Sequence, residues 1–129
     1  MDAANCRPRI LIIEDDPSIG AATKSLLDHL GYDVHWASSA NQAFDEIMHD
    51  GYRAALLDLN LGAEDGVKLV ISLRAAGHAV PPLVIVSAQA PENLRRAAET
   101  TGAVEIVRKP YAIATLKDAL SRAMTHPHG

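Results

Sequence analysis

The chain has 129 residues, of which 48% are hydrophobic and 22% are charged. This length and composition predict one folded globular domain, and they exclude collagen-like, low-complexity and disordered classes. The formal net charge of −4 disfavours a function that depends on attraction to nucleic-acid phosphates or to anionic membranes.

Five short apolar runs alternate with five longer amphipathic segments along the chain. The runs, which are rich in β-branched residues, predict strands at Ile10–Ile13, Val34–Ala37, Ala54–Leu57, Leu83–Val86 and Val104–Val107. The amphipathic segments predict helices at Pro17–Leu30, Ala40–Asp50, Gly66–Ala76, Glu92–Thr101 and Ala112–Met124. Four of these helices are closed by a glycine, a residue suited to a helix C-terminus, at Gly31, Gly51, Gly77 and Gly102.

The regular alternation of strands and helices predicts a (βα)5 domain of the α/β class. The first, third and fourth runs are almost continuously apolar, as strands of a parallel sheet are when helices cover both faces. An eight-stranded barrel would need about twice this length, so we expect a flavodoxin-like, doubly wound parallel sheet with strand order 2-1-3-4-5. His35 interrupts the second run, as is typical of an edge strand. We assign residues 1–8 to a flexible leader, 9–124 to the domain and 125–129 to a C-terminal tail.

The cellular compartment is predicted from the cysteine content and the absence of long apolar segments. The single cysteine, Cys6, excludes an internal disulfide and suits a reducing environment. No segment reaches the roughly 20 apolar residues of a membrane span, and the leader lacks the apolar core of a signal peptide. We therefore expect a cytoplasmic protein with no direct contact with a membrane or with nucleic acid.

Polar residues follow the predicted strands at the edge of the sheet where open α/β folds bind ligands. They are Glu14, Asp15 and Asp16 after the first strand, Asp58 and Asn60 after the third, Ser87 after the fourth, and Lys109 and Pro110 after the fifth. Carboxylates from Glu14, Asp15 and Asp58 would repel one another in a shared crevice, so we expect a cation among them. Hard oxygen ligands favour magnesium, manganese or calcium, and magnesium commonly shares its site with substrate phosphate. Ser87 and Lys109 suit the binding of phosphoryl oxygens.

Simpler explanations exist for single residues of this set. Asp16 followed by Pro17 is typical of a helix N-cap and the first helical position, and we prefer that interpretation for Asp16. Ser87 alone is compatible with a turn residue, and Lys109 alone with a solvated charge. The combination of these residue types at the ends of four strands is much more specific than any one of them.

These motifs resemble those of the receiver domains of two-component response regulators, over about residues 9–124. The matching segments are Ile10–Pro17, Leu56–Leu61 with Asp65 and Gly66 downstream, Val84–Ala88 and Lys109–Tyr111. The resemblance implies that Asp58 accepts a phosphoryl group and binds magnesium, together with Asp15 directly, Glu14 through water and Asn60 through its backbone carbonyl. It also implies that Ser87 binds the phosphoryl group, that Lys109 pairs first with Asp58 and then with the phosphate, and that Pro110 follows a cis peptide bond.

The same resemblance implies the partners and the type of activity. The phosphoryl donor would be a histidine kinase or a histidine phosphotransfer protein, and a downstream protein would bind the face around residues 91–111. The protein would catalyse only its own aspartyl phosphorylation and dephosphorylation, and so would not be an enzyme in the usual sense. Two residues depart from the family pattern: Gly62 replaces a usual proline, and Ile106 replaces the Tyr or Phe three residues before the lysine.

Two other functions are compatible with parts of the pattern. A magnesium-dependent phosphatase of the haloacid-dehalogenase type also has a nucleophilic Asp after an apolar strand, but its second Asp, two residues later, is Asn60 here. That replacement removes the proton donor for the leaving group. A flavodoxin would need Ser, Thr and Gly around the flavin phosphate, where this chain has Glu14, Asp15 and Asp16.

The only tryptophan, Trp36, is interpreted as a residue that caps the sheet.

Overall fold

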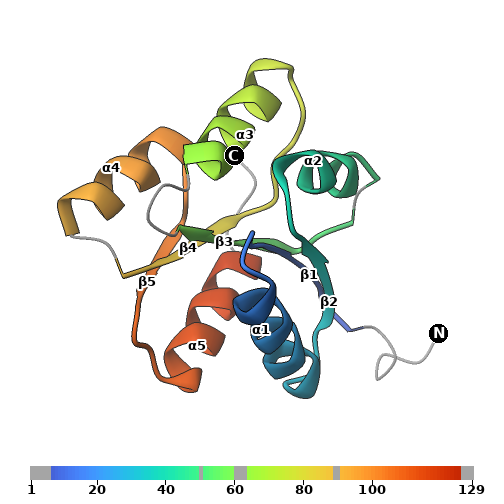
Figure 1. Cartoon of the computed structure of the whole chain (residues 1–129), viewed down its shortest axis with the longest axis vertical. Helices are drawn as coiled ribbons and strands as arrows, with labels where there is room; N and C mark the ends of the chain where they lie inside the picture. Colours follow the sequence, from blue (N-terminus) through green and yellow to red (C-terminus); the bar gives the residue numbers. More distant parts are fainter. Residues whose placement is uncertain (1–6, 50, 60–63, 89–90, 126–129) are drawn as a thin grey trace.

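The computed structural model describes residues 7–49, 51–59, 64–88 and 91–125, and these form a sheet between two layers of helices (Figure 1). The strands are β1 (Arg9–Ile13), β2 (Asp33–Ala37), β3 (Ala54–Leu59), β4 (Leu83–Ser87) and β5 (Glu105–Arg108). The helices are α1 (Pro17–His29), α2 (Ala40–His49), α3 (Glu64–Ala75), α4 (Pro91–Thr101) and α5 (Ile113–Met124). Residues 1–6 of the predicted leader and 126–129 of the predicted tail lie outside the described residues, as do Asn60 and Gly62.

The sheet has five strands in the order β2-β1-β3-β4-β5, and every pairing is parallel. The predicted flavodoxin-like, doubly wound α/β fold is therefore confirmed, with β2 at one edge and β5 at the other. The strand order reverses between β1 and β3, whose following helices lie on opposite faces of the sheet (Figure 1). Ile13 is paired with Leu57, so Glu14 and Asp58 follow neighbouring positions at this reversal, where open sheets bind ligands.

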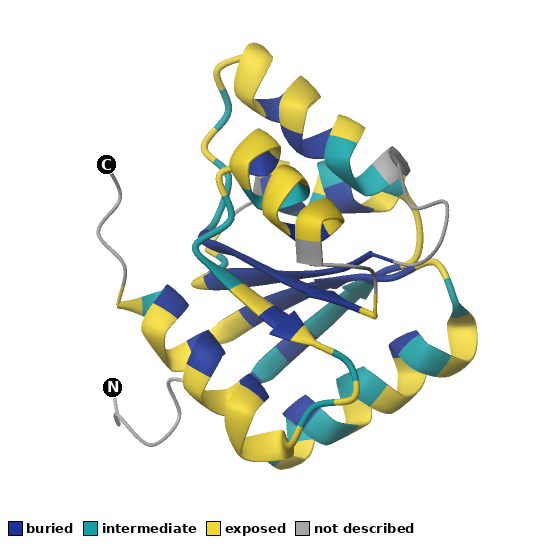
Figure 2. Ribbon diagram, turned by 90° about the vertical axis from the view of Figure 1, so that its left-hand side faces the viewer, coloured by how far each residue is buried: buried dark blue, intermediate teal, exposed yellow. Residues whose placement is uncertain are grey.

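The core consists of one apolar cluster on each face of the sheet. Alternation along β1 sends Ile10 and Ile12 toward α1 and α5, and Leu11 and Ile13 toward α2, α3 and α4. Every residue of β3 and β4 is buried, as expected for strands covered on both faces. Figure 2 shows these buried strands between helices whose outer surfaces are exposed. Among the described residues, every helix is too short or too polar to cross a lipid bilayer.

The ends of the elements differ from the prediction at positions important for the site. Asp58 lies inside β3 and Ser87 is the last residue of β4, whereas both were expected to follow their strands. The strands continue because Asp58 is paired with Val86 and Leu59 with Ser87. Backbone pairing does not depend on side-chain polarity, so the apolar run underestimates the strand length.

The four predicted helix-ending glycines all have positive φ, from 74° at Gly102 to 102° at Gly31.

Candidate functional site

The loop after β1 is fixed by hydrogen bonds at Glu14. This residue is only 2% exposed, its backbone N–H donates to the carbonyl of Ala37 at 3.1 Å, and its Oε1 accepts the backbone N–H of Asp16 at 2.9 Å. Asp15, between them, is exposed. The two acidic residues are therefore presented differently: Glu14 is buried, whereas Asp15 is exposed at the surface.

Asp16 caps the first helix, as the sequence predicted. Its Oδ1 accepts the backbone N–H groups of Ser18 at 2.8 Å and Ile19 at 3.1 Å, and Pro17 occupies the start of α1. These bonds satisfy two of the N–H groups that have no partner within a helix. The preferred interpretation of Asp16 as an N-cap is confirmed.

Asp58 and Lys109 form the central ion pair of the site. Lys109 Nζ lies 2.7 Å from Asp58 Oδ2 and 3.0 Å from Oδ1. The Asp58 side chain is 7% exposed and that of Lys109 is 25% exposed. Because a buried charge is costly without a compensating partner, the contact with Lys109 offsets the cost of burying the Asp58 side chain. The structure thus brings together two predicted site residues that are 51 positions apart in the sequence.

The backbone at the ends of β4 and β5 fixes the position of Lys109. Its backbone N–H donates to the carbonyl of Ser87 at 2.9 Å, and a cis peptide bond joins it to Pro110, as the family resemblance implied. Ser87 is fully buried and is paired with Leu59, the residue that follows Asp58. The predicted residues Asp58, Ser87 and Lys109 therefore lie at adjoining ends of β3, β4 and β5.

The structure buries the predicted carboxylates Glu14 and Asp58 and leaves Asp15 exposed. In the part of the chain that the structure describes, no group of three or more His, Cys, Asp or Glu could hold a metal ion. Glu14 is buried against the Asp16 backbone, and both Asp58 oxygens contact Lys109. The oxygen donors nevertheless fit magnesium, because this ion commonly binds one or two carboxylates and keeps several waters. Asn60, the predicted carbonyl ligand, lies outside the described residues.

Tyr111 lies close to the central ion pair, although no role at the site was predicted for it from the sequence. It is half-buried and packs against the apolar cluster between the sheet and helices α1 and α5. Burial raises the pKa of Tyr111, the neighbouring Lys109 charge lowers it, and the Asp58 charge raises it. Its position two residues after Lys109 was the sequence signal for this proximity.

Two further residues have surroundings that the sequence did not reveal. Ile106, at the position of the usual aromatic residue, is 41% exposed on β5, where it is paired with Ile85. Trp36 does more than cap the sheet, because its Nε1 donates to the backbone carbonyl of Glu14 at 2.9 Å. The loop that carries the acidic residues is therefore bonded to the side chain of the neighbouring strand β2.

Comparison with known proteins identifies the family to which this chain belongs. The model of the response regulator receiver domain matches residues 10–121. The transcriptional regulatory protein ZraR of Escherichia coli K12 is 29% identical over 119 residues, which are 92% of this chain and 27% of ZraR. The transcriptional regulatory protein QseB of Escherichia coli O157:H7 is 31% identical over 121 residues, which are 94% of this chain and 55% of QseB.

The fold is also found in a crystal structure of a sensor protein from Polaromonas sp. JS666. The two structures agree with a TM-score of 0.79 at 35% sequence identity, over 92% of this chain and 97% of that chain. The present chain spans just over a quarter of ZraR and just over half of QseB. With its strand order, the fold that it shares with the solved structure and the family match over most of its length, the chain belongs to the response regulator receiver domains of two-component systems.

Proposed function

We propose that this receiver domain accepts a phosphoryl group on Asp58 from a histidine kinase or a histidine phosphotransfer protein, in a magnesium-dependent step. Response regulators receive phosphoryl groups from histidine kinases and act on downstream effectors. The observation that carries the assignment to Asp58 is its ion pair with Lys109 at 2.7 Å. This pair combines a buried carboxylate with a cation that is 25% exposed.

The contacts of Lys109 suit the transfer step. One Asp58 oxygen forms a bond to phosphorus as the bond between phosphorus and the donor's histidine nitrogen breaks, and that nitrogen keeps the electron pair and takes a proton. Because Lys109 Nζ contacts both Asp58 oxygens, it can release the attacking oxygen without leaving the carboxylate. It then pairs with a phosphoryl oxygen, where a positive charge stabilises the charge on the group in transfer.

The acidic residues divide between direct and indirect contact with magnesium. Asp15 and Asp58 would bind the ion through their side chains, Asn60 through its backbone carbonyl and Glu14 through water. Magnesium supplies positive charge that offsets the repulsion between the phosphoryl oxygens and this acidic crevice. The exposure of Asp15 supports direct contact, and the burial of Glu14 supports an indirect role.

The phosphorylated state would act as a switch that ends by hydrolysis. The Ser87 hydroxyl donates a hydrogen bond to a phosphoryl oxygen. Water later hydrolyses the acyl phosphate. The domain therefore catalyses only its own phosphorylation and dephosphorylation. We propose that a downstream protein binds the face around residues 91–111. The exposed side chains of Arg95, Arg96 and Ile106 on α4 and β5 support this surface, and we expect the domain to act in the cytoplasm.

The proposed function is tested by phosphorylation with a small acyl-phosphate donor and magnesium, followed by intact-mass analysis. The wild type should gain one phosphoryl adduct, and Asp58→Asn should gain none. Asp16→Asn is the matched control, because it changes an acidic residue of the neighbouring loop that caps a helix instead of lining the crevice. Equal labelling of the wild type and Asp58→Asn would contradict the assignment.

A further inference from the structure

The end of β2 holds Glu14 by both polar groups of its backbone. The N–H of Glu14 donates to the carbonyl of Ala37 at 3.1 Å, and its carbonyl accepts the Trp36 indole N–H at 2.9 Å. The first bond continues the pairing of β1 with β2, in which Ile13 is opposite Ala37. The second bond is made by a side chain and is independent of the strand pairing. Together they fix the direction in which the chain leaves β1 and enters the acidic loop.

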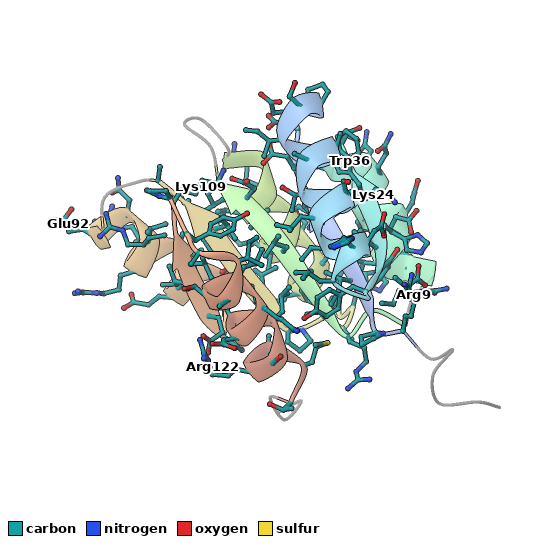
Figure 3. All side chains as sticks on the ribbon, turned by 90° about the horizontal axis from the view of Figure 1, so that it is seen from below. Arg9, Lys24, Trp36, Glu92, Lys109 and Arg122 are labelled. Carbon is teal, nitrogen blue, oxygen red and sulfur yellow. The ribbon has the colours of Figure 1, made fainter. Side chains whose placement is uncertain are left out.

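Helix α1 leaves space for the indole ring of Trp36. Figure 3 shows Trp36 beside this helix. A Cβ added at Gly20 would lie 2.1 Å from Trp36 Cε2 and 2.5 Å from Nε1, far inside van der Waals contact. The chain therefore has a residue that disfavours helix formation at the point where the ring passes. Gly20 also donates its N–H to the carbonyl of Asp16 at 2.8 Å, so the same turn of α1 closes the other end of the loop.

We propose that Trp36 is a positioning residue for the magnesium site, acting through the backbone of Glu14. This inference rests on the proposed function of Asp15 as a magnesium ligand. Trp36 holds the Glu14 carbonyl, the Glu14 carboxylate accepts the Asp16 N–H, and Asp16 caps α1. Asp15 lies between these two anchored residues, so the loop is preorganised to present its carboxylate before the ion arrives.

A purely structural role would depend on the ring and not on its N–H group, because Trp36 also packs against the apolar cluster of α1 and α5. The two roles are separated by replacing Trp36 with benzothienylalanine, which keeps the bicyclic ring and has sulfur in place of the N–H group. We expect the magnesium affinity, measured by calorimetry, to fall about threefold to tenfold, the usual net effect of one lost hydrogen bond. Trp36→Phe should give a similar loss.

Gly20→Ala tests the same contact from the helix. Its methyl group must displace the indole, so the magnesium affinity should fall although Trp36 is unchanged, and the emission of this single tryptophan should shift. The matched control is Val34→Ala, a buried residue of the same strand and the same apolar cluster. It should lower the stability of the fold and leave the magnesium affinity unchanged. An equal loss of affinity in Val34→Ala would overturn the proposal.

Hydrogen exchange at the Asp16 amide provides a readout that does not require magnesium. This amide should exchange several-fold faster in the benzothienylalanine variant than in the wild type, because the loop loses an anchor. Unchanged exchange and unchanged magnesium affinity would overturn the inference. If exchange is faster but the wild type and Asp15→Ala bind magnesium equally, Trp36 holds the loop and the assignment of the metal ligand in the proposed function is wrong.

Discussion

Replacement of Lys109 by methionine tests how strongly burial amplifies the ion pair with Asp58. At the observed distance of 2.7 Å and an effective dielectric constant of about 20, the gross attraction is about 6 kcal/mol. Desolvation of both groups offsets part of this attraction, and breaking a buried pair typically costs about 3–5 kcal/mol. Since Lys109 is 25% exposed, water reaches the remaining carboxylate, and we expect a loss of about 2–3 kcal/mol in the free energy of unfolding.

The assay is urea unfolding at pH 7 in the presence of EDTA, on the wild type, Lys109→Met, Asp58→Asn and the double variant. The cost of Lys109→Met should nearly disappear in the Asp58→Asn background, because no buried charge is then left without compensation. The chain offers a matched control in Lys24, which contacts Asp28 at the same distance of 2.7 Å, but with both side chains 41% exposed. Lys24→Met should cost less than about 0.5 kcal/mol.

Two results would refute this reasoning. Equal losses for Lys109→Met and Lys24→Met would mean that burial of Asp58 does not amplify the interaction. An unchanged cost of Lys109→Met in the Asp58→Asn background would mean that the loss does not come from the charge interaction between Lys109 and Asp58.

Three other outcomes are expected. Asp15→Ala should weaken magnesium binding in a calorimetric titration, whereas Asp16→Ala should mainly lower the free energy of unfolding by about 1 kcal/mol, because it removes a helix cap; the reverse pattern would contradict our ligand assignment. Beryllofluoride should shift backbone NMR signals within residues 91–111, and shifts confined to the crevice would show that this face is not coupled to phosphorylation. Burial and the hydrogen bond to Glu46 raise the pKa of Tyr52 above its usual 10.0, so the free energy of unfolding should fall as pH rises above about 10. In thermal unfolding, the stability of Tyr52→Phe should decline less over this range, and an identical decline would exclude Tyr52 as its source.

The fold was predictable because the alternation of apolar runs and amphipathic segments in the sequence reflects which residues are buried. Apolar runs such as Leu83–Val86 are short, rich in β-branched residues and followed by amphipathic segments, and these features are typical of parallel strands covered on both faces. Strand ends were less predictable, because Asp58 and Ser87 are polar residues that still take part in backbone pairing. The topology of such a sheet brings the strand ends together, so Asp58 and Lys109 could be assigned to one crevice from the sequence.

The contacts that depend on side-chain geometry could not be predicted. The bond from Trp36 to Glu14 joins residues 22 positions apart and requires a specific ring orientation beside Gly20. Composition and periodicity indicate which residues are apolar or helical, but they do not determine how an indole ring fits against a helix. The exposure of Ile106 was likewise unpredictable, because it depends on how completely α4 covers the last strand.

Among the described residues, strand β5 pairs only with β4, and such an edge of a sheet invites the addition of a strand from another molecule. Here the edge is only four residues long, and charged Glu105 and Arg108 occupy its two ends. Arg122 of α5 contacts Glu105 Oε1 through Nε at 3.0 Å and Nη2 at 2.9 Å, which links this end of the strand to a helix. A short, charged edge is a poor template for intermolecular β-sheet formation, so the fold can expose Ile106 to solvent without inviting aggregation.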